Sequence, residues 1–236
     1  MLQIAVLNES TVISDADVKK MIPAFTSQWN KDLTSVWNVC DVAFTFTTKR
    51  KSPARDSWWV VFLDEPDQGH ALAYHDLTNE GLPISKVYVK TILADKFSLS
   101  VGASHEICEM AVDPWLNRAY QDQDGAFWAA EICDPVEDAE YGYEIGGVLV
   151  TDFVTPNWFR HGPFNGPIDF RHHAHEAFQV LTGGFVQKFE PKSGWQQITG
   201  AKASRTLRGS HAPAGSRRER RARGGKKWTP SEHKWG

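Results

Sequence analysis

The chain has 236 residues, 41% of them hydrophobic and ten of them tryptophan, which is enough apolar material for one domain or two small ones. No apolar run approaches the roughly 18 residues that a membrane span requires, and the first residues lack the basic and apolar regions of a signal peptide. Three cysteines, an odd number, are typical of a reducing compartment, so we expect a cytoplasmic protein with no membrane partner.

Charge divides the chain into an acidic body and a basic tail. The net charge is −3, but residues from Lys202 onward carry 11 Lys and Arg against two Glu, whereas the preceding residues carry 15 Lys and Arg against 27 Asp and Glu. The tail has too few apolar residues to offset the entropy lost on ordering. We therefore predict a folded domain over residues 1–200 and a disordered basic tail over residues 201–236, which could bind nucleic acid or another acidic surface.

The first part of the chain predicts one long helix and a series of strands. Ser14 or Asp15 can cap a helix that runs to about Trp37, with apolar residues every three or four positions and Pro23 as a potential kink. Alternating or wholly apolar runs predict strands at residues 2–8, 42–47, 58–64, 71–75 and 86–91.

A second helix is predicted to follow these strands. Ser98 or Ser100 can cap it, and Asp113 ends it because the residue before a proline is pushed out of the helical region. A third helix is expected to start at Asp122 or Asp124 and to end just before Pro135.

The remaining chain is predicted to be mostly irregular. Hairpins are expected at residues 143–152, turning at the two Gly, and at residues 180–189. A histidine-rich run at residues 171–176 is interpreted as a surface loop.

The second helix carries a candidate metal motif. His105 and Glu109 lie four residues apart, so both side chains project from the same face of a helix and both could bind a metal. Glu106 lies one step round the helix, where its carboxylate could act as a base. Zinc peptidases use H-E-x-x-H in this way, and here Glu109 takes the position of the second histidine.

A second pair of carboxylates follows the first motif. Glu131 lies 22 positions after Glu109, and Asp134 lies three positions beyond Glu131. The two motifs together resemble the gluzincin branch of the zincin-like metallopeptidases, in which a later helix carries a Glu ligand with an Asp beyond it. His105, Glu106 and Glu131 match that pattern, Asp134 matches it loosely, and Glu109 departs from it. The variant is also similar to uncharacterised bacterial and phage proteins.

The resemblance implies both a fold and an activity. It implies an α+β, zincin-like fold: a twisted mixed sheet, a backing helix, an active-site helix and an irregular C-terminal half, with the strand at residues 71–75 as the edge that pairs with a peptide substrate. It further implies a zinc-dependent peptidase, a hydrolase of peptide or protein substrates. One Zn²⁺ would be held by His105, Glu109 and Glu131, with Glu106 as general base.

The carboxylate at position 109 leaves the metal and its other ligands open. Two anionic ligands neutralise a divalent ion, so catalysis would be weaker or the ion would be Mn²⁺ or another divalent metal. Asp113, four residues beyond Glu109, is a rival third ligand, although its place before a proline favours a capping role. Candidate donors to the oxyanion of the reaction are Tyr141, Tyr143 and His161.

A second hypothesis is a protein of the same fold without catalytic activity. A histidine with acids on a helix is often an exposed salt-bridged face, but the apolar neighbours of this motif indicate burial, and buried acids need partners. The same fold could serve as a structural or binding protein, associated with a phage particle, with the basic tail as its attachment arm. Cys108 and Cys133, each inside a motif, are interpreted as small buried side chains.

Overall fold

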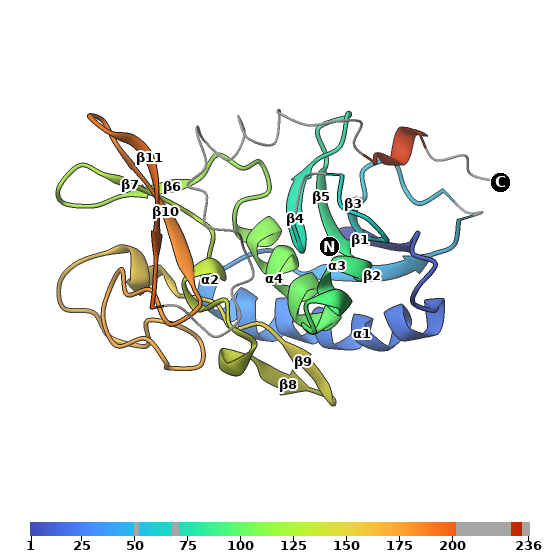
Figure 1. Cartoon of the computed structure of the whole chain (residues 1–236), viewed down its shortest axis with the longest axis horizontal. Coiled ribbons are helices and arrows are strands. Elements are labelled where there is room, and N and C mark those ends of the chain that lie inside the picture. Colours follow the sequence, from blue (N-terminus) through green and yellow to red (C-terminus); the bar gives the residue numbers. More distant parts are fainter. Residues whose placement is uncertain (50–51, 68–70, 202–227, 233–236) are drawn as a thin grey trace.

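Residues 1–49, 52–67, 71–201 and 228–232 are described by the computed structural model, which has the predicted α+β architecture (Figure 1). Its main sheet is mixed and has the strand order β2-β1-β3-β5-β4. Four strands run parallel, whereas β4 lies at the edge and pairs antiparallel with β5. The strand bounds are Leu2–Asn8 for β1, Val42–Thr47 for β2, Trp58–Leu63 for β3, Ala73–Leu77 for β4 and Pro83–Tyr88 for β5.

Two helices, α1 and α4, pack on one face of this sheet (Figure 1). A π-helical segment, Gln28–Leu33, joins α1 to α2 without a break, so the predicted helix to about Trp37 is confirmed, and Pro23 lies inside α1 without ending it. None of the helices in the described ranges has the length and apolar character that a membrane crossing needs. The helix bounds are Asp15–Ser27 for α1, Thr34–Trp37 for α2, Val89–Ala94 for α3 and Leu99–Val112 for α4.

The caps of α1 and α4 follow from the sequence. The hydroxyl of Ser14 accepts the amide of Asp17, whose carboxylate accepts the amide of Ser14 in return, which is a capping box. The hydroxyl of Ser98 accepts the amide of Val101 at the start of α4, and Asp113 is the C-cap residue of this helix. The Asp113 carboxylate accepts the amides of Asn117 and Arg118 at 2.9 and 3.0 Å, so it stabilises the turn that leaves the helix.

The predicted third helix is wrong, because residues 119–129 form a β-hairpin. One carboxylate oxygen of Asp122 accepts the amides of Asp124 and Ala126, and the other accepts the indole N–H of Trp128. Asp, Asn and Ser side chains stabilise turns and helix N-termini through the same kind of bond. Here Asp122 stabilises a turn that includes Gly125. Gly125 has a φ of +83°, which lies outside the helical region, so a helix could not run through it. Glu131 therefore follows a strand and lies outside any helix.

The predicted hairpin at residues 180–189 is also misplaced. The Gly183–Gly184 pair precedes β10, and β10 pairs with β11 and with β7 instead. Gly184 is needed for close packing: a Cβ there would lie 2.7 Å from the carbonyl oxygen of Asp134. The hairpin predicted at residues 143–152 is confirmed as β8–β9, with Gly146 and Gly147 at its turn. The bounds are Ala119–Gln121 for β6, Phe127–Ala129 for β7, Tyr143–Ile145 for β8, Val148–Val150 for β9, Phe185–Glu190 for β10 and Gly194–Thr199 for β11.

The second face of the main sheet is covered in part by a segment from the predicted tail. The ring of Trp228 packs edge-on against Trp59, with ring centroids 6.2 Å apart, and the Trp228 amide donates to the carboxylate of Asp67 at 3.1 Å. A short 3₁₀ helix, Pro230–Glu232, follows. The predicted disorder of residues 202–227 and 233–236 lies outside the described residues.

A buried pair of acids fastens the loop after β9. One oxygen of Asp152 accepts the amides of Phe153 and Arg171, and its carboxyl group lies against that of Asp169. Burial, followed by the interaction with Asp169, raises the pKa of Asp152 to about 9. Asp152 is therefore protonated in the fold at neutral pH, where it can donate to Asp169.

Replacing Asp152 with Asn should remove a pH dependence from the stability. An acid whose pKa rises from 3.8 to about 9 on folding stabilises the fold most at low pH, and this contribution falls as the pH rises between those values. Asn keeps the acceptor oxygen and a permanent N–H toward Asp169. In urea unfolding at several pH values, the Asp152→Asn variant should gain stability relative to wild type as the pH rises; a constant difference would contradict the assignment.

Candidate metal centre

Helix α4 is fixed on the sheet by its contacts with β4 and β5. The hydroxyl of Ser85 on β5 donates to the backbone carbonyl of Glu106 at 3.1 Å and also contacts the sulfur of Met110. His75 of β4 lies opposite Ser85 in the sheet register and faces the same helix. The strand and the helix thus bring side chains from separate parts of the chain to one buried layer.

Six buried side chains that could bind metal or protons meet in this layer. They come from β4, from α4 and from the segment that follows β7. They are His75, His105, Glu106, Glu109, Glu131 and Asp134.

Five of these side chains form two groups that share one member. Ligand atoms of His105, Glu109 and Asp134 all lie within 4.8 Å of one another. Ligand atoms of His75, Glu109 and Glu131 meet the same limit. Each group contains one imidazole and two carboxylates, and Glu109 belongs to both.

The individual contacts show how Glu109 is shared. Its Oε1 lies 3.3 Å from His105 Nε2 and accepts the amide of Cys133 at 3.2 Å, while its Oε2 lies 3.7 Å from His75 Nδ1. His105 Nε2 also lies 3.2 Å from Asp134 Oδ1. The two oxygens of one carboxylate therefore face different histidines.

Glu106 takes a different position from the shared carboxylate. Its Oε2 lies 3.1 Å from His75 Nδ1, and Glu106 belongs to neither of the two ligand groups. The carboxylate can hold the His75 ring in place and remain available for proton transfer.

Two of the three predicted metal ligands, His105 and Glu109, lie in one group, and the third, Glu131, lies in the other. The structure brings His105 and Glu109 together, and it buries Glu131 beside Glu109. Glu131 joins the group of His75, however, and the carboxylate that contacts His105 is Asp134, which the sequence suggested only as a supporting residue.

His75 was missed by the sequence analysis. Its only signal is a histidine at the end of an otherwise apolar strand, which has no spacing relation to the motif on α4. The antiparallel return of β4 along β5 places His75 opposite Ser85. This pairing is a long-range feature that no local pattern of residues carries.

The charges of the cluster favour a cation. Burial alone would lower the pKa of His105, but Glu109, Asp134 and Glu106 together hold it well above its usual range. Burial raises the pKa of Glu109 well above its usual range, and the charges of Glu131 and Asp134 raise it further. Crowded carboxylates resist ionisation, and a bound cation would relieve that repulsion.

The donor set fits a divalent metal. Imidazole nitrogen and carboxylate oxygen are both ligands of zinc, and the same mixture suits Mn²⁺ and Fe²⁺. Ligands about 2.1 Å from one tetrahedral ion lie about 3.4 Å from one another. The contacts of His105 with Glu109 and Asp134, at 3.3 and 3.2 Å, have that spacing.

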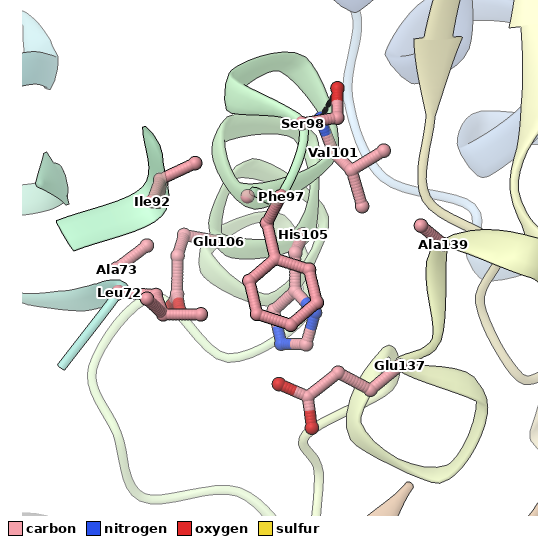
Figure 2. A pocket seen from close by; sticks show the side chains of 11 residues that line it. Leu72, Ala73, Ile92, Phe97, Ser98, Val101, His105, Glu106, Glu137 and Ala139 are labelled. Atoms are coloured by element: carbon pink, nitrogen blue, oxygen red, sulfur yellow. Dashed lines mark hydrogen bonds between the residues drawn. The ribbon is translucent and has the colours of Figure 1, made fainter. Parts of the chain in front are cut away.

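A pocket opens onto His105 and Glu106 (Figure 2). It is a small pocket of about 40 Å³ beside the start of β4. Gly102 of α4 leaves room in its wall, since a Cβ there would lie 3.0 Å from the Ile92 side chain. The remaining lining residues are Leu72, Ala73, Phe97, Ser98, Val101, Glu137 and Ala139.

The three candidate oxyanion donors do not line this pocket. The hydroxyl of Tyr143 donates to Asp32 at 2.7 Å, the ring of Tyr141 packs on His173, and His161 packs on Phe178. Their contacts connect them to other parts of the fold.

The interpretation of the two cysteines is confirmed. Cys108 and Cys133 are both buried, and burial, followed by the neighbouring Cys108, raises the pKa of the Cys133 thiol well above its usual range. Of these two residues, the backbone amide of Cys133 contacts the cluster, through Glu109.

Known proteins give no further guide to this site. Compared with protein-family models, with curated proteins and with solved structures, the chain matches none.

Proposed function

We propose that the chain is a metal-dependent hydrolase of the zincin type, which cleaves peptide bonds in extended substrates. The observation that carries the proposal is the position of His105 and Glu106, which line a pocket beside an edge strand while the carboxylates of Glu109 and Asp134 contact His105 Nε2. A candidate metal ligand and a candidate base thus lie at the same pocket, which substrate could enter from solvent.

The arrangement of the sheet supports this proposal. The expected zincin architecture has an active-site helix packed behind an edge strand, and α4 packs against β4 and β5 in this way. Among the described strands β4 pairs only with β5, so its outer edge can present backbone N–H and C=O groups to an extended peptide. A peptide added to that edge would run past the pocket.

His105, Glu109 and Asp134 would hold the catalytic ion, which we propose to be zinc. A divalent ion at this place supplies Lewis-acid chemistry by polarising a carbonyl and lowering the pKa of water. In the gluzincin branch the third ligand is the Glu that Glu131 matches, but here Glu131 is grouped with His75 and Glu109.

Glu106 would act as the general base. In this proposal its carboxylate accepts a proton from the attacking water and passes it to the leaving amine. His75 is a positioning residue, because its Nδ1 lies 3.1 Å from Glu106 Oε2 and can orient the carboxylate by donating to it.

The pocket walls indicate a preference for apolar side chains. Ile92, Phe97 and Val101 give the pocket apolar lining, and Glu137 also lines it (Figure 2). We propose that a hydrophobic residue next to the cleaved bond fits this wall.

The test is cleavage of a library of unstructured peptides by the full-length chain, followed by mass spectrometry. We expect cleavage beside hydrophobic residues, its loss with a chelator such as EDTA, and its return when Zn²⁺ or Mn²⁺ is added. EDTA already saturated with Zn²⁺ is the matched control and should leave cleavage intact. Cleavage that is indifferent to EDTA, or none by metal-loaded protein, would contradict the proposal.

A peptide-binding protein without catalysis is the second candidate. The observation that favours it is the burial of Glu106, which is 2% exposed and already contacts His75. Under this proposal the metal-loaded chain would bind peptides from the same library and release them uncut.

A further inference from the structure

We propose that the cluster is a two-metal site in which Glu109 bridges a pair of divalent cations. One ion would be held by His105 and Asp134, and the second by His75 and Glu131. The inference rests on the proposed function for the first ion, and it adds a second ion that the H-E-x-x-E motif does not imply.

The orientation of the Glu109 carboxylate carries this inference. Its Oε1 faces His105 and its Oε2 faces His75, so each oxygen lies beside a different imidazole. A carboxylate placed in this way can bind one ion with each oxygen. Hydrolases with two metals hold them about 3.5–4 Å apart, a separation that one bridging carboxylate can span.

The side chains around Glu109 are duplicated. Each group has its own imidazole and its own carboxylate, and each draws them from two segments distant in sequence. A single ion at His105 would not engage Glu131 or the ligand group that it forms with His75 and Glu109, although the ligand atoms of that group satisfy the same 4.8 Å limit.

The His75 ring has the surroundings of a metal ligand. It is fully buried, its Nδ1 faces the carboxylates of Glu106 and Glu109 at 3.1 and 3.7 Å, and its Nε2 has no hydrogen-bond partner in the described part of the chain. Metal-binding histidines commonly donate one ring N–H to a carboxylate and keep the other nitrogen for the metal.

Buried acids gather around the cluster. Glu106, Glu109, Glu131 and Asp134 are all buried, and so is Glu137, which lines the pocket with His105. Burying carboxylates without a counter-charge is costly, so cations bound among them would be favoured.

Metal stoichiometry tests the inference. Full-length protein loaded with Mn²⁺ and dialysed should contain two equivalents by plasma mass spectrometry, and its EPR spectrum should show an exchange-coupled pair. Glu131→Gln, which keeps the size of the side chain, should reduce the content to one equivalent with the six-line spectrum of isolated Mn²⁺. His75→Ala should do the same.

Further variants separate this inference from the proposed function. Asp134→Asn should also leave one equivalent, Glu109→Gln should weaken both sites, and Glu144→Gln, on the exposed side of β8, should keep two. One equivalent in wild type that survives Glu131→Gln but is lost in His105→Ala would overturn the second ion and leave the proposed function standing. No bound metal in wild type would overturn both.

Discussion

Replacing Glu106 with Gln should lower kcat/KM for peptide cleavage by about 10²–10⁴-fold, the usual range for loss of a general base. Gln has nearly the same size and can keep a hydrogen bond to His75, which lies 3.1 Å from the native carboxylate. It cannot accept a proton from water. Because Glu106 belongs to neither ligand group, the bound metal should be unchanged.

This variant is informative only if both quantities are measured on the same protein. Cleavage rate and metal content should be compared in wild type, Glu106→Gln and Glu144→Gln, the last removing an exposed carboxylate of β8. Glu144→Gln should cleave at the wild-type rate. Near-normal cleavage by Glu106→Gln would show that another group takes the proton, and loss of metal would show that Glu106 is a ligand.

Replacing Asp67 with Asn should cost about 3–5 kcal/mol of stability, because it leaves a buried lysine without its counter-charge. Lys86 of β5 is 1% exposed, and its Nζ lies 2.6 Å from Asp67. The hydroxyls of Tyr74 and Tyr88 also donate to this carboxylate. Burial by itself raises the pKa of Asp67, but these groups outweigh it and hold the pKa below its usual range.

Urea unfolding of three variants checks this prediction. Glu65→Gln is the matched control, because that side chain is 69% exposed and its ion pair with Lys90 lies at the surface, where a pair is worth about 0–1 kcal/mol. The double variant Asp67→Asn/Lys86→Met should recover part of the lost stability, since it also removes the buried lysine charge that Asp67→Asn leaves without its carboxylate. The buried pair has no structural role if Asp67→Asn is no less stable than Glu65→Gln.

Local signals explain which parts of the fold could be predicted. Helix α4 could be placed because Ser98 begins it and Asp113, before a proline, ends it. Strands β1, β2 and β3 could be recognised from their apolar or alternating runs, whereas the strand predicted at residues 86–91 is displaced: β5 ends at Tyr88 and helix α3 follows at once. The β6–β7 hairpin could not, because Asp122 suits a helix start and a turn equally well, and the turn is chosen by the pairing of β7 with β10.

The candidate site also contains residues that local sequence could predict and residues that it could not. His105, Glu106 and Glu109 share one helix, so their spacing alone brings them to one layer. Glu131 and Asp134 could be named as carboxylates at a suitable distance in sequence, but their division between two groups depends on a loop packed against Gly184. His75 depends on the antiparallel pairing of β4, which is a tertiary feature.

The metal content of the wild-type chain, compared with that of Glu109→Gln, is the most direct test of the account. Glu109 belongs to both ligand groups, so one substitution of nearly equal size should affect the whole centre. We predict that purified and dialysed wild-type protein retains at least one equivalent of a divalent metal and that Glu109→Gln retains much less under the same conditions. Equal metal in both proteins, or none in either, would contradict a metal centre at this cluster.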